Sequence, residues 1–229
     1  MGKTRLLFLS ANPWSTSRIL IDEEARAVFD GLQAGPYRDH FESHNHSAIQ
    51  PMDLQRLLMI HQPHIVHFCG HGSKSQRIIL GGSAGKGRTI GIDGLRRVLA
   101  LYNRHVSLVV LNACFTAKHA VSTAKVIDYS IGTESSIGDK ASVAFSYAFY
   151  RALSFGRSVK EAFESAQAEL ALGRIRRSQG IALFTRDGLA ETDVFPRDQH
   201  LQTILPFYNR RIAVAEKLKR EIPLLEALA

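Results

Sequence analysis

The chain has 229 residues, 45% of them hydrophobic, and a formal net charge of +8. This length and composition allow one domain with a substantial core, with or without an appended segment. Two cysteines cannot supply the disulfide framework of a small secreted protein. No signal peptide, myristoylation site or membrane span is visible, so we expect a cytoplasmic protein that does not enter a membrane.

The excess positive charge lies in residues 1–190, because residues 191–229 contain equal numbers of acidic and basic side chains. Arg174, Arg176 and Arg177 form a local basic cluster. Basic surfaces attract nucleic acids or acidic proteins. Here no aromatic residues are interleaved with the arginines and no nucleic-acid-binding module is recognisable. The cluster is more typical of a solvated helix end, and we do not expect nucleic acid as a direct ligand.

Apolar runs alternate with amphipathic stretches along the chain, which predicts an α/β protein. In chain order we expect a strand at 5–11, a helix at 22–32, a strand at 41–47, a helix at 52–61, a strand at 64–68, a hairpin of 77–80 with 88–92, a helix at 94–101, a strand at 108–111, a helix at 117–124, a strand at 125–131, helices from 139 and from 159 to about 172, and a strand at 181–184. Ser158 and Glu161 have the spacing of a capping box. This order predicts a mostly parallel sheet with helices on both faces.

Two of the predicted buried strands run directly into reactive side chains. The strand at 64–68 leads into Gly70-His71-Gly72, and the strand at 108–111 leads into Asn112-Ala113-Cys114. The carboxyl ends of neighbouring parallel strands face one crevice, so His71 and Cys114 could meet there. Such a pair is the arrangement of a cysteine nucleophile with its base.

Four segments in this order resemble the caspase-like CHAT proteases of prokaryotes, which are relatives of caspases and separases. They are FLSANP at 8–13, HFCGHG at 67–72, VLNAC at 110–114 and IGDKA at 137–141. The resemblance spans residues 6 to about 172. It implies a caspase-like sheet, peptide-bond cleavage by a His71–Cys114 dyad, and no cofactor. Because the base of these proteases often lacks a carboxylate partner, we assign no third catalytic member.

The residues also indicate how the chemistry could proceed. A thiol attacks an amide in its thiolate form, and the leaving amine must then receive a proton. One imidazole can take the proton from the thiol and give it to the amine. The tetrahedral intermediate needs donors for its oxygen. Because Gly72 has no side chain, a backbone N–H can approach closely there. The N–H groups of Gly72 and Cys114 are therefore our candidates for the oxyanion hole.

Three residues are candidates for substrate binding. Relatives that cut after Arg or Lys carry a carboxylate two residues before the cysteine, where this chain has Asn112, so that route to basic specificity is missing. Asp139 matches a position where related separases place an acidic pocket residue, but an aspartate that opens a helix is more often its N-cap. Asn12, at the end of the first strand, is a further candidate for the crevice.

Other interpretations of the same motifs carry less weight. Cys69 lies at a strand end without a base of its own, so we interpret it as a buried structural thiol. His67, Cys69 and His71 alternate along one strand and could belong to a zinc site, but no fourth ligand is evident and we expect no metal. The glycine-rich run at 81–87 does not have the spacing of a phosphate-binding loop.

We expect a CHAT protease domain at residues 1–190 and a partly helical extension at 191–229, which packs on the domain or docks a partner. The leading hypothesis is a cysteine endopeptidase that acts on a protein substrate in prokaryotic defence or programmed cell death. CHAT proteases are commonly joined to sensor modules, so we expect a regulatory partner. The alternatives are a catalytically silent interaction module and, less favoured, a basic nucleic-acid binder.

Overall fold

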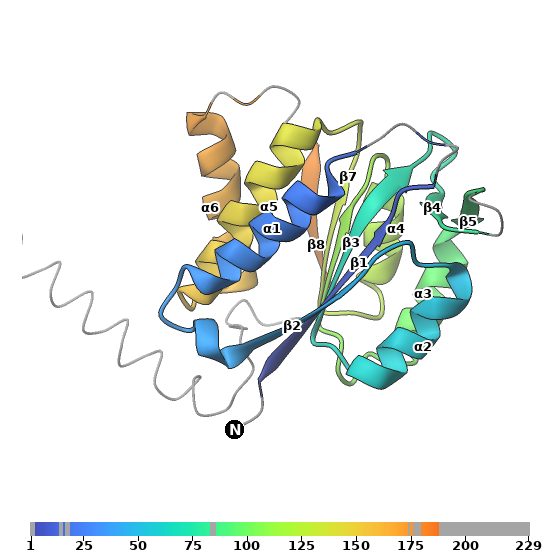
Figure 1. Ribbon diagram of the computed structural model, residues 1–229, viewed down its shortest axis with the longest axis horizontal. Helices are drawn as coiled ribbons and strands as arrows, with labels where there is room; N and C mark the ends of the chain where they lie inside the picture. Colours follow the sequence, from blue (N-terminus) through green and yellow to red (C-terminus); the bar gives the residue numbers. More distant parts are fainter. Residues whose placement is uncertain are drawn as a thin grey trace, which may run out of the picture.

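The computed structural model describes residues 3–13, 16, 19–82, 86–173, 175 and 180–187. Its centre is one twisted sheet in the order β2-β1-β3-β6-β7-β8 (Figure 1). The strands are β1 (Thr4–Ala11), β2 (Phe41–His46), β3 (Ile65–Gly72), β6 (Leu108–Asn112), β7 (Tyr129–Thr133) and β8 (Ile181–Thr185). All neighbours in this sheet are parallel except β8, which is antiparallel to β7. The α/β fold with a mostly parallel sheet is confirmed.

Helices cover both faces of the sheet, as Figure 1 shows. One layer contains α1 (Ile21–Gln33), α5 (Asp139–Ser154) and α6 (Val159–Leu172). The opposite layer contains α2 (Pro51–His61), α3 (Ile92–Ala100) and α4 (Ala117–Thr123). A short 3-10 helix, η1 (Arg38–His40), precedes β2, and the hairpin of β4 (Ile78–Leu80) and β5 (Arg88–Ile90) extends from the end of β3. No helix in the described ranges is both long and apolar enough to cross a membrane.

The alternation of side chains along β1 divides the core into two halves. Leu6 and Phe8 pack into the cluster beneath α1, α5 and α6. Leu7 and Leu9 pack into the cluster beneath α2, α3 and α4. Successive side chains of a strand point to opposite faces, so a central strand buried on both sides must be apolar at nearly every position. At the carboxyl ends of the strands the same alternation continues past the core. Side chains there can point into the crevice at that edge of the sheet.

Most predicted elements agree with the structure, although the hairpin strand predicted at 88–92 ends at Ile90 and the helix predicted at 94–101 begins at Ile92. Further differences concern three strands. The third strand does not stop at residue 68: β3 continues to Gly72, where its last two residues pair with β4. The predicted strand at 125–131 begins late, because the N–H groups of Val126 and Ile127 still bond the carbonyl of Thr123. The final strand runs antiparallel, which alternation along the sequence alone does not specify.

The predicted capping box is confirmed. The Ser158 hydroxyl accepts from the Glu161 N–H, and the Glu161 carboxylate accepts from the Ser158 N–H. Between α5 and α6, Gly156 has a φ of +79°, a conformation that glycine adopts without strain. The predictions for residues 191–229, for the arginine cluster and for the middle of the glycine-rich run lie outside the described residues.

Candidate active site

The structure brings His71 and Cys114 to one pocket. Strands β3 and β6 are neighbours, with Cys69 opposite Asn112, so the residues two further along each chain emerge at the same place. Both His71 and Cys114 line a small pocket of about 50 Å³ at the carboxyl end of the sheet. The two side chains that the sequence paired therefore lie on the same side of the sheet, the side of α1 and α5.

His71 is oriented by a residue that we expected to contact substrate. Its Nε2 donates a hydrogen bond to Oδ1 of Asn12, at 3.1 Å. Asn12 directly follows β1, which pairs with β3 in parallel through Ala11 and Gly70. This bond places the proton on Nε2 and leaves Nδ1 as the basic nitrogen. His71 thus has an amide neighbour that selects one tautomer of its ring.

Cys114 stands on a sharp turn directly after β6. The next residue, Phe115, has a φ of 59°, which is unusual for a bulky side chain. The turn is held by Thr116, whose hydroxyl contacts the carbonyls of Leu111 and Ala113 at 2.9 and 2.8 Å, and by Thr133, whose hydroxyl donates to the Ala113 carbonyl at 2.6 Å. These bonds fix the backbone on either side of the thiol.

The thiol itself is partly exposed. Its Sγ lies 3.7 Å from the hydroxyl of Ser136 and donates to it. This hydroxyl gives the sulfur a hydrogen-bond partner that carries no charge.

Gly72 lies directly against the nucleophile's backbone. A Cβ built on Gly72 would stand 1.7 Å from the Cys114 carbonyl oxygen and 3.3 Å from the Cys114 nitrogen. Only glycine allows this approach, which is the physical reason for the Gly-His-Gly motif. The close contact is compatible with an oxyanion hole made by the Gly72 and Cys114 N–H groups, and that role stays a prediction.

Asp139 and Asn112 both line the pocket with His71 and Cys114. The interpretation of Asp139 as an N-cap is wrong: Gly138 is the capping residue, and Asp139 is the first residue of α5. Asp139 is exposed, with its carboxylate available at the pocket. Asn112 is buried, and its amide nitrogen donates to Ser146 and to a buried carboxylate, that of Glu24.

Glu24 is a buried pocket residue that sequence reasoning missed. It lies on α1, is 3% exposed, and lines the same pocket. Its carboxylate accepts hydrogen bonds from five side chains on three other elements: His67, Cys69, Asn112, Ser142 and Ser146. The available signal was its position four residues before Val28 and eight before Leu32, on the apolar stripe of an amphipathic helix.

This network keeps Glu24 ionised. Burial by itself raises the pKa of the carboxyl, but the hydrogen bond and charge of His67, together with the donors from Ser142 and Cys69, outweigh it and hold the pKa below its ordinary value of 4.5. A buried negative charge therefore lines the pocket. Four of the five donors are neutral, and the imidazole of His67 is the one that can carry a compensating proton.

Cys69 is a buried structural thiol, as the sequence suggested. Its Sγ donates to Glu24 at 3.2 Å, and burial together with the Glu24 charge raises its pKa far above the ordinary value. His67 is fully buried between Glu24 and the Tyr150 hydroxyl. The three alternating residues of β3 thus share one face, but each has a protein partner: His67 and Cys69 contact Glu24, and His71 contacts Asn12.

The fold is that of the caspase-like cysteine proteases. The structure is similar to a secreted C11 cysteine protease from Bacteroides thetaiotaomicron solved with an irreversible peptide inhibitor, with a TM-score of 0.57, 12% identity, and 80% of this chain and 66% of that chain covered. It is also similar to the Arg-specific proteinase gingipain R (TM-score 0.55, 10% identity, 80% and 46% covered) and to caspase-1 from Spodoptera frugiperda (TM-score 0.52, 10% identity, 80% and 86% covered). These likenesses establish the fold.

The CHAT domain profile matches residues 14–193, and the chain belongs to the CHAT domain family. Two curated relatives are each 22% identical to it. One is a Roc-COR-CHAT protease from an unknown prokaryotic organism, aligned over 72% of this chain, and the other is a probable protease from Gillisia limnaea, aligned over 67%. The alignments span 16% and 27% of those proteins, so the chain matches only part of each relative.

Proposed function

We propose that this protein is a cysteine endopeptidase in which Cys114 is the nucleophile and His71 the general base and acid. The observation that carries the proposal is their convergence on one pocket, with Asn12 selecting the tautomer of His71 that leaves Nδ1 basic. The protease names of both curated relatives support it.

The reaction runs through a thioester. Nδ1 of His71 takes the proton of the Cys114 thiol, and the sulfur attacks the carbonyl carbon of the scissile peptide bond. The oxygen of the tetrahedral intermediate accepts from the N–H groups of Gly72 and Cys114. The carbon–nitrogen bond then breaks, and His71 gives its proton to the leaving amine. Water, deprotonated by His71, attacks the thioester and releases the new carboxylate and the free thiol.

The pocket chemistry favours a basic side chain on the acyl side of the scissile bond. Asp139, Glu24 and Asn112 all line the pocket. Asp139 is exposed and Glu24 is buried. Two carboxylates beside the nucleophile attract a guanidinium or ammonium group. The pocket of about 50 Å³ is too small for a whole arginine side chain, so binding requires the wall of Ile19 and Leu20 to move.

Membership of the CHAT family suggests the biological setting. A CHAT protease with a protein substrate fits an effector in prokaryotic defence or programmed cell death, working in the cytoplasm under control of a regulatory protein. The small resting pocket supports such control, because a partner that opens it would switch on cleavage. Residues 1–190 would form the catalytic domain and residues 191–229 an extension that braces it or docks the partner.

A covalent probe tests the proposal. The full chain is treated with peptide ketones that have a leaving group on the carbon next to the carbonyl, so that a thiolate can displace it. The residue on the peptide side of the ketone is Arg, Lys, Gln or Ala. The adduct is located by mass spectrometry. We expect labelling of Cys114 that disappears in Cys114→Ala and His71→Ala and persists in Cys69→Ala. Labelling that is equal in wild type and His71→Ala, with and without candidate activators, would favour the catalytically silent interaction module instead.

A further inference from the structure

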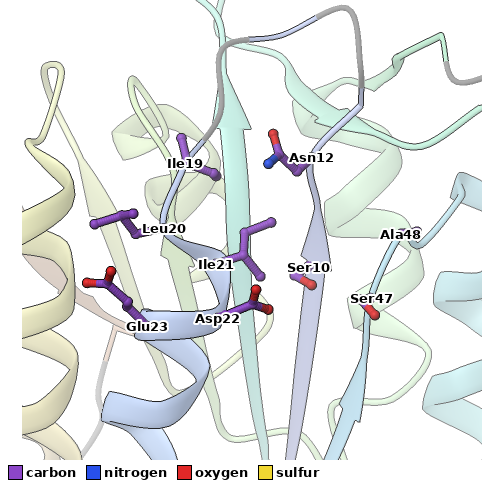
Figure 2. A pocket seen from close by; sticks show the side chains of 9 residues that line it. All are labelled: Ser10, Asn12, Ile19, Leu20, Ile21, Asp22, Glu23, Ser47 and Ala48. Carbon is purple, nitrogen blue, oxygen red and sulfur yellow. The ribbon is translucent and has the colours of Figure 1, made fainter.

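A second and larger cavity lies beside the active-site pocket. It has a volume of about 510 Å³ and is lined by Ser10, Asn12, Ile19, Leu20, Ile21, Asp22, Glu23, Ser47 and Ala48 (Figure 2). We call it the α1 pocket, because it lies between the start of α1 and the carboxyl ends of β1 and β2. Its volume falls within the range of sites that hold side chains or small ligands.

The α1 pocket and the active site share a wall. Ile19 and Leu20 line both cavities. Asn12, at the top of the α1 pocket in Figure 2, is also the residue that accepts the hydrogen bond of His71. A chain that passes over the dyad therefore reaches the α1 pocket within a few residues.

Ser10 supplies an unsatisfied polar group in this cavity. The residue is 1% exposed, and its hydroxyl has no hydrogen-bond partner among the described residues. Figure 2 shows its side chain between those of Asp22 and Ser47. Buried hydroxyls are nearly always paired, because an unpaired one has lost its hydrogen bonds to water without a replacement. A hydroxyl left without a partner at the base of a cavity indicates that a ligand supplies the partner.

The charge of the lining decides which ligand fits. Asp22 and Glu23 are exposed carboxylates in the first turn of α1, and none of the described residues that line the pocket is basic. The partial positive charge at the helix start is about half an elementary charge, which two full negative charges exceed. The pocket therefore favours a cation that also donates hydrogen bonds, as the ammonium of lysine or the guanidinium of arginine does.

We propose that the α1 pocket is a second substrate subsite, which binds a basic side chain of the protein substrate a few residues from the scissile bond. This inference rests on the proposed protease function. The cationic group lies beside the carboxylate of Asp22 and donates to the hydroxyl of Ser10, while Glu23 adds a second negative charge to the lining. Its aliphatic stem packs against Ile19 and Ile21. The pocket thereby adds a sequence requirement separate from that of the pocket beside Cys114.

A scanning series of peptides tests the subsite. Each peptide keeps the same residue at the cleavage site and carries either lysine or its uncharged analogue norleucine at one other position. At one position we expect lysine to raise kcat/KM about tenfold, as two partly exposed ion pairs together would. The double variant Asp22→Asn/Glu23→Gln should abolish this preference. The control Asp30→Asn/Glu164→Gln removes the same charge away from the pocket and should retain it.

Ser10→Ala provides an independent readout. Removing an unpaired buried hydroxyl should leave the melting temperature unchanged or raised, while the lysine preference falls. Cleavage without a lysine preference at any position, or with a preference that Asp22→Asn/Glu23→Gln leaves intact, would overturn the subsite and leave the protease proposal standing.

If no peptide is cleaved, binding separates the two proposals. Fluorescein-labelled lysine and norleucine peptides are titrated into the full-length Cys114→Ala protein and followed by fluorescence anisotropy. Tighter binding of the lysine peptide that is lost in the Asp22→Asn/Glu23→Gln background supports the subsite without catalysis. Equal binding of the two peptides rejects it.

Discussion

Nε2 of His71 and Oδ1 of Asn12 are joined by a hydrogen bond of 3.1 Å that crosses from the end of β3 to the residue after β1. An amide oxygen can only accept, so the bond fixes the proton on Nε2 and holds the ring plane. It does so without adding a negative charge beside the imidazole. We therefore propose that Asn12, which the sequence offered as a substrate-binding residue, positions the ring of His71.

Two substitutions of Asn12 should separate its effect on the orientation of the His71 ring from the effect of a charge beside that ring. Asn12→Ala removes the acceptor, and we expect kcat/KM to fall about fivefold to tenfold, as the loss of one net hydrogen bond would predict. Asn12→Asp keeps an acceptor and adds a carboxylate, which stabilises the protonated imidazole. Because His71 must be unprotonated to act as the base, the acidic limb of the pH–rate profile should move to higher pH. Coincident pH profiles for wild type and Asn12→Asp would contradict this role.

The contact of Gly72 with Cys114 predicts a strong steric effect. In Gly72→Ala the new Cβ would lie 1.7 Å from the Cys114 carbonyl oxygen, so the backbone must shift at the nucleophile. We expect labelling of Cys114 to fall at least about a hundredfold, since an oxyanion donor would be lost together with the geometry. Gly91→Ala is the matched control, because a Cβ there meets nothing within 4 Å. Normal labelling of Gly72→Ala would show that the two backbones do not lie this close together in solution.

The bonds of Thr116 predict that the turn carrying Cys114 depends on one hydroxyl. Thr116→Val is nearly isosteric but leaves the Thr133 N–H, which bonds the Thr116 hydroxyl at 3.1 Å, without its acceptor. We expect the free energy of unfolding to fall by about 2 kcal/mol and Cys114 to be labelled more slowly. Thr89→Val removes an exposed hydroxyl that accepts from Arg77 and should change stability by less than about 0.5 kcal/mol. Equal stability of the two variants, measured by urea denaturation, would show that the Thr116 hydroxyl does not hold the turn that carries Cys114.

The sequence contained enough to pair His71 with Cys114 because both follow apolar runs, and buried parallel strands place their carboxyl ends together. It could not assign Asn12, because the partner of a histidine is set by strand order, and only the pairing of β1 with β3 brings the two together. It also misjudged Asp139, since an aspartate before an amphipathic run has the same local pattern whether it caps the helix or opens it.

Glu24 was missed for a related reason. A glutamate in the first turn of a helix is usually a solvated residue that complements the helix dipole, and the three acidic residues in the first turn of α1 look alike in sequence. Which of Asp22, Glu23 and Glu24 is buried depends on the rotation of α1 against β3 and α5. The donors that make burial tolerable come from residues 43 to 122 positions away.

The ionised Glu24 predicts a pH-dependent contribution to stability. Its folded-state pKa lies below the ordinary value of 4.5, so the stabilisation is present above pH 4.5 and is lost as the pH falls through the folded-state value. Glu24→Gln should lower the free energy of unfolding by about 3 kcal/mol at pH 7, because five donors lose a charged acceptor. The difference from wild type should narrow below pH 4.5. Urea denaturation across this acidic range and at neutral pH measures the difference in the free energy of unfolding. The exposed Glu164→Gln is the control. A difference between wild type and Glu24→Gln that is constant across this pH range would refute an ionised Glu24.

Asp139 should determine the preference for basic residues at the cleavage site. Asp139→Asn keeps the shape of the side chain and removes its charge, so we expect kcat/KM for substrates with Arg or Lys before the scissile bond to fall about tenfold, while substrates with Gln there change little. Asp93→Asn, in the first turn of α3, is the control, because it also removes a negative charge from a helix start. Losing the interaction of that charge with the helix dipole should cost either variant no more than about 1 kcal/mol of stability. If Asp139→Asn lowers cleavage of all substrates equally, the carboxylate supports the fold of the pocket, and Glu24 alone must account for any basic specificity.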